Sequence, residues 1–256
     1  MGKKARSRNA RTHDENIINM NYHNQQAMIN GPQKKSWNIH DLQPITPLNE
    51  KQKDMFHSWF QGDNLCAHGS AGTGKTFLSL YLAFDEMLDY KEHHQIIIVR
   101  SAVASRDIGH LPGSKEEKEE IFKLPYIDIC AELFGRKSTF ADMEEANIVK
   151  FMTTSHIRGI TLDNSIIIVD EIQNMQAEEI NSIMTRVGRN TRVILCGDSK
   201  AQCDLKRHET TGVHNLLKIV ERIDAFSSIE FEHSDIVRSE FCKNWIIASN
   251  DVARDS

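Results

Sequence analysis

The sequence contains no long hydrophobic run, and no apolar stretch in its 256 residues approaches the roughly 20 that a membrane-spanning helix requires. It also has no excess of basic residues, because the formal net charge is -5. This balance argues against a protein that coats nucleic acid through bulk positive charge, and it is compatible with a local basic groove. The basic residues near the N-terminus precede no apolar core, so the sequence predicts no secretory signal. We therefore expect a protein with no membrane partner.

Paired cysteines are absent as well. The five cysteines are scattered, odd in number and form no C-x-x-C pair, which disfavours a disulfide framework. Free thiols of this kind are typical of core residues in a reducing compartment. We therefore predict a cytoplasmic protein whose thiols are free; the cysteines are Cys66, Cys130, Cys196, Cys203 and Cys242.

The chain divides into a polar N-terminal segment and a longer body. Residues 1–44 are rich in Asn, Gln, Lys and Arg, and the stretch GKKARSRNAR near the start holds basic residues and no acid. We expect this segment to be a flexible arm, with Trp37 or Ile39 docking onto the body. A basic arm can contact phosphate backbones, and a solvated tail without a specific partner is the alternative. Residues 45–256 are predicted to form a single domain.

Short apolar segments alternate with helical patterns along the body. Strands are predicted where apolar, mostly β-branched, residues run together, in NLCAH, QIIIV, SIIIVDE, RVILCGD and SSIEFEH. This alternation predicts an α/β fold with a mostly parallel sheet and helices on both faces. Ligands bind at the carboxyl ends of the strands in such sheets. The polar residues that end three of these strands are therefore expected to converge; they are Arg100, Asp170 with Glu171, and Asp198.

The stretch GSAGTGKT, residues 69–76, matches the phosphate-binding pattern G-x-x-x-x-G-K-[ST] at every fixed position. Glycines let the backbone curl so that successive N–H groups point at phosphate oxygens. Lys75 is expected to reach the β- and γ-phosphates, and Thr76 to offer its hydroxyl to Mg²⁺. Because a strand precedes the stretch and an amphipathic helix follows it, we predict a triphosphate site. Its residues are Gly69, Ser70, Ala71, Gly72, Thr73, Gly74, Lys75, Thr76 and Phe77.

A second motif, SIIIVDEIQN, has the Walker B form, in which an apolar strand runs into two acids. Asp170 is predicted to hold Mg²⁺ through its water shell, and Glu171 to polarise an attacking water. This second carboxylate favours a hydrolase over a small-molecule kinase. Gln173, just beyond the pair, is a candidate for coupling hydrolysis to another event.

A third motif, CGDSKAQCDL, follows another buried strand. We predict that this strand lies beside the Walker B strand, with its polar end near the γ-phosphate. Gln202 is then placed to sense that phosphate or to orient the water. Asp198 is a candidate for the same site, or a turn residue only, because Gly-Asp-Ser favours turns.

Together, GSAGTGKT, IIIVDEIQN and GDSKAQCDL resemble the motifs of the PhoH family of P-loop ATPases, which shares motifs with superfamily 1 helicases. TPLNEKQ, VRSAVASRDIGHLPG, HIRGITLDNSIIIVDE and HSDIVRSEF are similar to further segments of that family, so the resemblance covers residues 44–248. Ser101 departs from it, since many members have Pro there. The resemblance implies a single RecA-like core. Compact members occur in phage genomes, which suggests a phage-encoded protein in the host cytoplasm.

The resemblance also implies roles for residues outside the phosphate loop. Gln52 lies where the family carries an adenine-reading glutamine, and its amide can both donate to and accept from the adenine edge. Arg238, in the late Asp-x-Val-Arg motif, is implied to neutralise charge on the transferring phosphoryl group, in cis or from a neighbouring subunit. Arg100, Arg106 and Arg158 are candidates for a nucleic-acid or subunit surface, or for ordinary ion pairs.

We expect a Mg²⁺-dependent ATPase that couples ATP hydrolysis to binding or remodelling of nucleic acid, either RNA or single-stranded DNA. Its predicted catalytic residues are Lys75, Glu171, Gln202 and Arg238. Superfamily 1 helicases close two cores around a strand and this chain has room for one, so we expect a homo-oligomer such as a ring. A nucleotide-dependent regulatory module without helicase activity is the main alternative, and a kinase is a weaker one. The family's phosphate-starvation name reflects expression and specifies no reaction.

Overall fold

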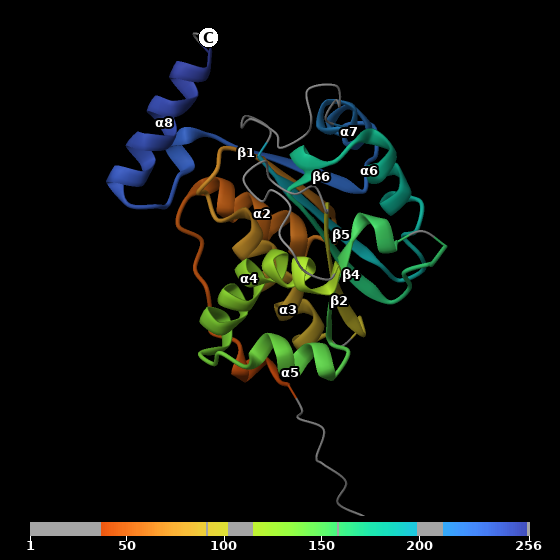
Figure 1. Cartoon of the computed structure of the whole chain (residues 1–256). Helices are drawn as coiled ribbons and strands as arrows, with labels where there is room; N and C mark the ends of the chain where they lie inside the picture. Colours follow the sequence, from red (N-terminus) through yellow and green to blue (C-terminus); the bar gives the residue numbers. More distant parts are fainter. Residues whose placement is uncertain (1–36, 91, 102–114, 158, 199–211, 255–256) are drawn as a thin grey trace, which may run out of the picture. The chain divides into compact units, whose positions relative to one another are not determined.

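The computed structural model describes residues 37–90, 92–101, 115–157, 159–198 and 212–254 (Figure 1). Six strands form one sheet in the order β3-β2-β4-β5-β1-β6, and neighbouring strands pair in parallel. They are β1 (Asn64–Gly69), β2 (Gln95–Arg100), β3 (Val149–Thr153), β4 (Ser165–Asp170), β5 (Arg192–Gly197) and β6 (Phe226–Phe231). The predicted α/β fold with a parallel sheet is confirmed.

Helices cover both faces of this sheet. In Figure 1, α2, α3, α4 and α5 lie on one side of the sheet, and α6 and α7 lie on the other. The described α-helices are α2 (Glu50–Phe60), α3 (Lys75–Asp89), α4 (Lys115–Phe134), α5 (Thr139–Glu145), α6 (Ala177–Met184), α7 (Val213–Val220) and α8 (Glu240–Arg254). A hydrophobic core lies on each face of the sheet, and each strand contributes side chains to both, because successive side chains of a strand point to opposite faces. Ile96 and Ile98 of β2 enter the core under α3, while Ile97 and Val99 enter the core under α6 and α7.

The strand order places the three predicted motifs together. β5 lies between β1, which leads into the phosphate loop, and β4, which ends in the acidic pair. The predicted pairing of the third-motif strand with the Walker B strand is confirmed, with Ile168 opposite Ile194 and Val169 opposite Leu195. The carboxyl ends of β1, β5 and β4 therefore form one continuous edge of the sheet.

The sequence pattern did not predict strand β3. β3 pairs with β2 from Val149 to Thr153 and forms one edge of the sheet. Lys150 interrupts its apolar run and is exposed, whereas the side chains on either side of it are buried. A single charged residue in a segment of five thus hides the strand pattern.

The folded body begins before the boundary predicted from composition. A compact unit starts at Trp37, ahead of residue 45. The Trp37 ring packs edge-on against Phe134 with ring centroids 5.5 Å apart, and Leu42 is buried in the same core. The expected docking of Trp37 and Ile39 is thus seen, because both pack against that core. These apolar residues lie in a mostly polar stretch of the sequence, so composition alone placed the boundary too late.

α4 combines two halves of different character. Residues 115–124 of the charged segment GSKEEKEEIFKL, a predicted solvated helix, form its first half, in which Glu120 and Leu124 are exposed. In the second half, Tyr126, Cys130 and Leu133 are buried at helical spacing. No helix in the described ranges, α4 included, is long and apolar enough to cross a bilayer.

Candidate nucleotide site

The phosphate loop begins where β1 meets the end of β6. Gly69 has φ 109°, in the left-handed region, and a Cβ atom there would lie 2.1 Å from the carbonyl oxygen of Phe231. The next residue, Ser70, donates its backbone N–H to that same oxygen at 2.9 Å. Only glycine fits this close approach, since any side chain would push β6 away. The start of the loop is therefore fixed to the sheet.

The loop ends at the first turn of α3. Gly74 occupies the N-cap position with φ 89°, and Lys75 and Thr76 are the first residues of the helix. The first N–H groups of a helix have no carbonyl partner within it, and its dipole favours anions at this end. α3 thus presents the helix N-terminus that the sequence motif predicts for binding phosphate.

The side chain of Lys75 is folded into the loop. Its ammonium donates to the carbonyl oxygens of Gly69 at 3.1 Å and Ser70 at 2.6 Å. Burial lowers the pKa of this ammonium, and the carboxylates of Asp198, Asp170 and Glu171 act in the opposite direction. The positive charge therefore sits among three acids and the phosphate-binding backbone, where a triphosphate would add further negative charge.

Asp170 accepts hydrogen bonds from three other residues of the site. Its Oδ1 accepts from Thr76 Oγ1 at 3.0 Å and from Cys196 Sγ at 3.1 Å, and its Oδ2 accepts from Tyr126 OH at 2.8 Å. These donors come from α3, β5 and α4, so three elements fix one carboxylate. The three hydrogen bonds therefore fix the orientation of this buried carboxylate.

The pair Thr76 and Asp170 fits a Mg²⁺ ion. A hydroxyl and a carboxylate are hard oxygen donors, and Mg²⁺ usually takes one or two protein ligands while water and phosphate oxygens complete its octahedron. Among the residues that the structure describes, no group of three or more His, Cys, Asp or Glu side chains could hold a metal without such help. The donor set therefore suits a metal that arrives with a nucleotide.

Glu171 stands at the end of β4 in an unusual backbone conformation. Its φ is 55°, in the left-handed region that non-glycine residues seldom adopt, which turns the chain sharply after Asp170. Burial raises the pKa of its carboxyl, and the neighbouring Asp170 adds to the effect. A carboxyl with a raised pKa is a stronger proton acceptor, which suits a general base.

Gln173 links the acidic pair to the third motif. Its Nε2 donates to Glu171 Oε2, and its Oε1 accepts the backbone N–H of Asp198 at 2.9 Å. A Cβ atom on Gly197 would lie 2.5 Å from this Oε1, so the glycine makes room for the contact. The proposed coupling residue thus joins the ends of β4 and β5 directly.

Gln52 braces the loop from α2. Its Nε2 donates to the carbonyl oxygen of Thr73 at 3.0 Å, and its Oε1 accepts the backbone N–H of Leu48 at 2.7 Å. The side chain is buried, with 3% of its surface exposed. Both polar atoms of the amide that was predicted to read adenine are therefore bonded within the protein.

Arg238 lies beside the loop of its own chain. Its Cγ would be 3.1 Å from a Cβ atom built on Gly72, and the preceding residue, Val237, donates its N–H to the Gly72 carbonyl at 3.0 Å. Arg238 is exposed. The late Asp-x-Val-Arg motif thus touches the phosphate loop, although it follows it by more than 150 residues in the sequence.

Some predicted residues lie elsewhere or outside the described ranges. Gln202, Arg106 and Arg158 belong to segments that the structure does not describe. Arg100 ends β2 opposite Asp170, and its guanidinium lies over the Phe122 ring at 5.4 Å. Its charge lowers the pKa of Glu171, after the larger opposing effects of burial and Asp170.

Two site residues were missed by sequence reasoning. Cys196 was predicted to be a core thiol, and it also donates to Asp170. Tyr126 belongs to a helix whose charged first half drew attention away from its second half. The apolar spacing of Tyr126, Cys130 and Leu133 was the available signal that this half is buried.

Comparison with known proteins identifies relatives of the whole body. A family model described as PhoH-like protein matches residues 44–250. Protein PhoH of Escherichia coli (strain K12) is 31% identical over 210 residues, which are 81% of this chain and 59% of that protein. A PhoH-like protein of Bacillus subtilis (strain 168) is 32% identical over 190 residues, which are 73% of this chain and 58% of that protein. The chain thus spans less than two thirds of each of these curated relatives.

A solved structure shows the same fold at low identity. The large terminase from a thermophilic bacteriophage superposes with a TM-score of 0.50 and 14% identity. The match covers 78% of this chain and 50% of the terminase chain. The likeness supports the fold alone, an α/β fold with a parallel sheet and helices on both faces.

Proposed function

The chain belongs to the PhoH-like protein family, and on that premise we propose that it is a Mg²⁺-dependent ATPase. The observation that carries the proposal is the 3.0 Å hydrogen bond between Thr76 Oγ1 and Asp170 Oδ1. It brings the phosphate loop and the acidic strand end, which are far apart in the sequence, to one point. Thr76 and Asp170 would hold the metal there, and the metal would neutralise negative charge on the bound phosphates.

The remaining residues of the site divide the hydrolytic step between them. Lys75 swings from the loop carbonyls to the β- and γ-phosphates, while the N-terminus of α3 holds their oxygens. Glu171 accepts a proton from a water whose oxygen bonds to the γ-phosphorus, as the bond to the β,γ-bridging oxygen breaks. Gln173 holds the Glu171 carboxylate in position. The products are ADP and inorganic phosphate.

We propose that nucleic acid, either RNA or single-stranded DNA, is the partner whose binding depends on hydrolysis. The helicase-like combination of motifs supports this assignment, and positive charge comes from Arg100 at the end of β2 and from Arg238 beside Gly72. A regulatory module that binds a partner without unwinding is the second candidate, because only one core is present in the described residues. We also propose a homo-oligomer in the cytoplasm. The free thiols of Cys66, Cys130, Cys196 and Cys242 suit a reducing compartment.

The test is the steady-state ATPase rate of the full chain, measured with Mg²⁺, with EDTA, and with single-stranded RNA or DNA. We expect Mg²⁺-dependent hydrolysis that one of the two polymers stimulates. Lys75→Ala protein should lose triphosphate binding and serves as the control for contaminating ATPases. Hydrolysis without stimulation by either polymer would favour the regulatory module. Hydrolysis that persists in Lys75→Ala protein, or that needs no metal, would contradict the assignment.

Arg238 is tested by mixing. Because its side chain lies against Gly72 of its own chain, we propose that it acts in cis, so Arg238→Ala should lower turnover more than nucleotide affinity. A mixture of Arg238→Ala and Lys75→Ala proteins should then remain inactive. Recovery of activity on mixing would show that the arginine is supplied by a neighbouring subunit.

A further inference from the structure

α8 carries an exposed apolar stripe. Phe241, Trp245 and Val252 are 76%, 68% and 67% exposed, and none of the described residues of this helix is buried. Together with Ala248 they lie four, three and four residues apart, so they occupy one face of the helix. The Phe241 and Trp245 rings are 6.4 Å apart. Two adjacent aromatic side chains facing water are characteristic of an interaction surface.

The opposite face of α8 is attached to the body. Ile246 Cδ1 would lie 3.4 Å from a Cβ atom on Gly72, and Asn250 bonds to His233 at 3.0 Å. Ile246 and Asn250 fall roughly half a helical turn away from the stripe. Within the described part of the chain, the stripe therefore points away from the body and faces solvent.

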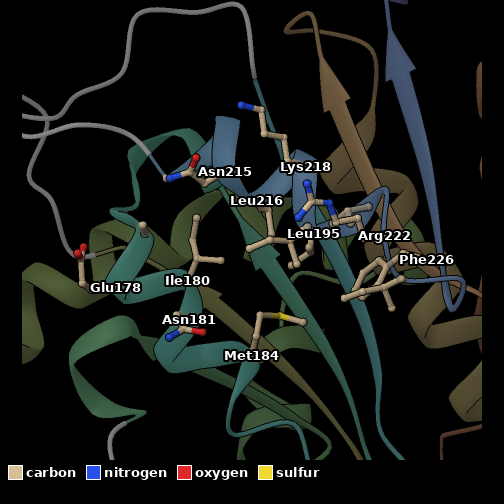
Figure 2. Close-up of a pocket in the computed structure, with 15 residues that line it drawn as sticks. Glu178, Ile180, Asn181, Met184, Leu195, Asn215, Leu216, Lys218, Arg222 and Phe226 are labelled. Carbon is tan, nitrogen blue, oxygen red and sulfur yellow. The ribbon is translucent and has the colours of Figure 1, made fainter.

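The same chain has an apolar groove that could receive the α8 stripe. A cavity of about 600 Å³ opens between α6 and α7, with Ile180, Met184, Leu195 and Phe226 among its apolar lining residues (Figure 2). Ile219 and Ile223, which also line it, are 54% and 42% exposed. The groove lies over β5 and β6 on the face opposite α3, so it is separate from the nucleotide site.

The net charges beside the two surfaces have opposite signs. Glu240 and Asp251 lie on one flank of the α8 stripe, as the 100° step per residue places them. Lys218 and Arg222 line the groove on its α7 side and Glu178 lines it on its α6 side, so the charged lining residues leave one net positive charge (Figure 2). An acidic flank repels phosphate backbones, which disfavours base stacking on Phe241 and Trp245. It equally disfavours pairing between two α8 helices, because their acidic flanks would meet.

We propose that the α8 stripe of one copy docks into the α6–α7 groove of the next copy. The two surfaces differ, so the contact is head-to-tail and generates a ring or an open chain of subunits. Full burial of one Phe and one Trp removes roughly 300–500 Å² from water. A stable interface needs about 800 Å² per partner, so the aromatic pair would form its centre.

This contact has a consequence for the nucleotide site. α8 follows directly after Arg238, and its body-facing side touches Gly72 of the phosphate loop. A neighbour that holds α8 would therefore also restrain the loop. The proposal names the surfaces of the homo-oligomer proposed above and rests on that part of it; the ATPase assignment does not depend on it.

The test is sedimentation of the full chain and of two variants over a range of concentrations. Trp245→Glu places a charge in the stripe, and Ile219→Glu places one in the groove; both side chains are more than half exposed, so folding should be preserved. Each variant should associate at least about tenfold more weakly than the wild type. Leu124→Glu on α4, 55% exposed and remote from both surfaces, is the matched control and should associate normally.

Mixing the two variants gives the sharpest result. Trp245→Glu protein keeps an intact groove and Ile219→Glu protein keeps an intact stripe, so the mixture should form dimers and nothing larger. A wild type that stays monomeric overturns the proposal, as does Ile219→Glu protein that associates normally. Loss of nucleic-acid binding, with normal association, in Trp245→Glu protein would assign the stripe to nucleic acid. Association as predicted without ATP hydrolysis would leave the proposal standing and overturn the ATPase assignment.

Discussion

The two ends of β5 bury charge in different ways. At the amino end, Arg192 pairs with Glu86, donates to the carbonyl oxygens of Trp59 at 2.8 Å and Asp63 at 2.6 Å, and lies 3.4 Å from the centre of the Trp59 ring. Glu86 also contacts His93 at 3.1 Å. This end matches opposite charges within the protein, as a structural ion pair does.

Beside the carboxyl end of β5, two acids at the end of β4 lie next to each other and are held mainly by neutral donors. Asp170 takes hydrogen bonds from Thr76, Tyr126 and Cys196, and the pKa of Glu171 is raised by burial and then by Asp170. The buried Lys75 and the half-buried Arg100 supply positive charge to this cluster. The same strand thus contributes to a closed stabilising cluster at one end and, at the other, to a site whose charges suit a metal and phosphates.

The largest effect should come from Glu171→Gln at the carboxyl end. Removing the general base should lower single-turnover hydrolysis by about 10²–10⁴-fold. ATP affinity should change little, because the loop, Lys75 and Thr76 remain in place. Calorimetric titration and rapid quench measure the two quantities separately. An enzyme that keeps its rate after this substitution would show that another group takes the proton.

Arg192→Met should remove the ion pair with Glu86 at the amino end of β5. It leaves Glu86 buried without its main partner, so the free energy of unfolding should fall by about 3–5 kcal/mol. The nucleotide affinity of the folded protein should stay the same, since the substitution lies at the far end of the strand. Urea unfolding and nucleotide titration at low temperature measure the two effects. The double variant with Glu86→Gln should regain part of the stability; if it does not, the pair is not the stabilising element.

Tyr126→Phe should have a smaller effect at the carboxyl end. It removes the donor to Asp170 Oδ2 and keeps the ring packed against Phe151, with an expected loss of about 1–2 kcal/mol of stability. The Mg²⁺ concentration for half-maximal hydrolysis should also shift, since the carboxylate is less well oriented. Tyr90→Phe, on the exposed side chain after α3, is the control. A stability loss without any change in the Mg²⁺ dependence would limit Tyr126 to packing.

The two ends of β5 also differ in how far the sequence predicts them. The sheet, its parallel strands and the meeting of GSAGTGKT with Asp170 were predictable, because each is encoded in a local pattern and the strand order follows from few rules. The Arg192 cluster was not, since its members are scattered among residues 59–192 and no motif links them. Tyr126 and Cys196 escaped for the same reason. Their roles depend on which side chain a tertiary contact brings to Asp170.

The smallest effect, and the finest distinction, concerns Gln52. Its amide is bonded to Thr73 and Leu48, so Gln52→Leu should loosen the loop without changing base selection. We expect ATP and GTP affinities to fall together by about three- to tenfold, which corresponds to one or two ordinary hydrogen bonds. An adenine-reading amide would instead cost ATP affinity alone, because GTP presents the opposite donor and acceptor pattern. Titration of both nucleotides into wild type and variant decides between a bracing and a reading role. If Gln52 braces the loop, neutral hydrogen-bond donors hold both the phosphate loop and Asp170 at the carboxyl ends of the strands. At the amino end of β5, paired charges hold the structure instead.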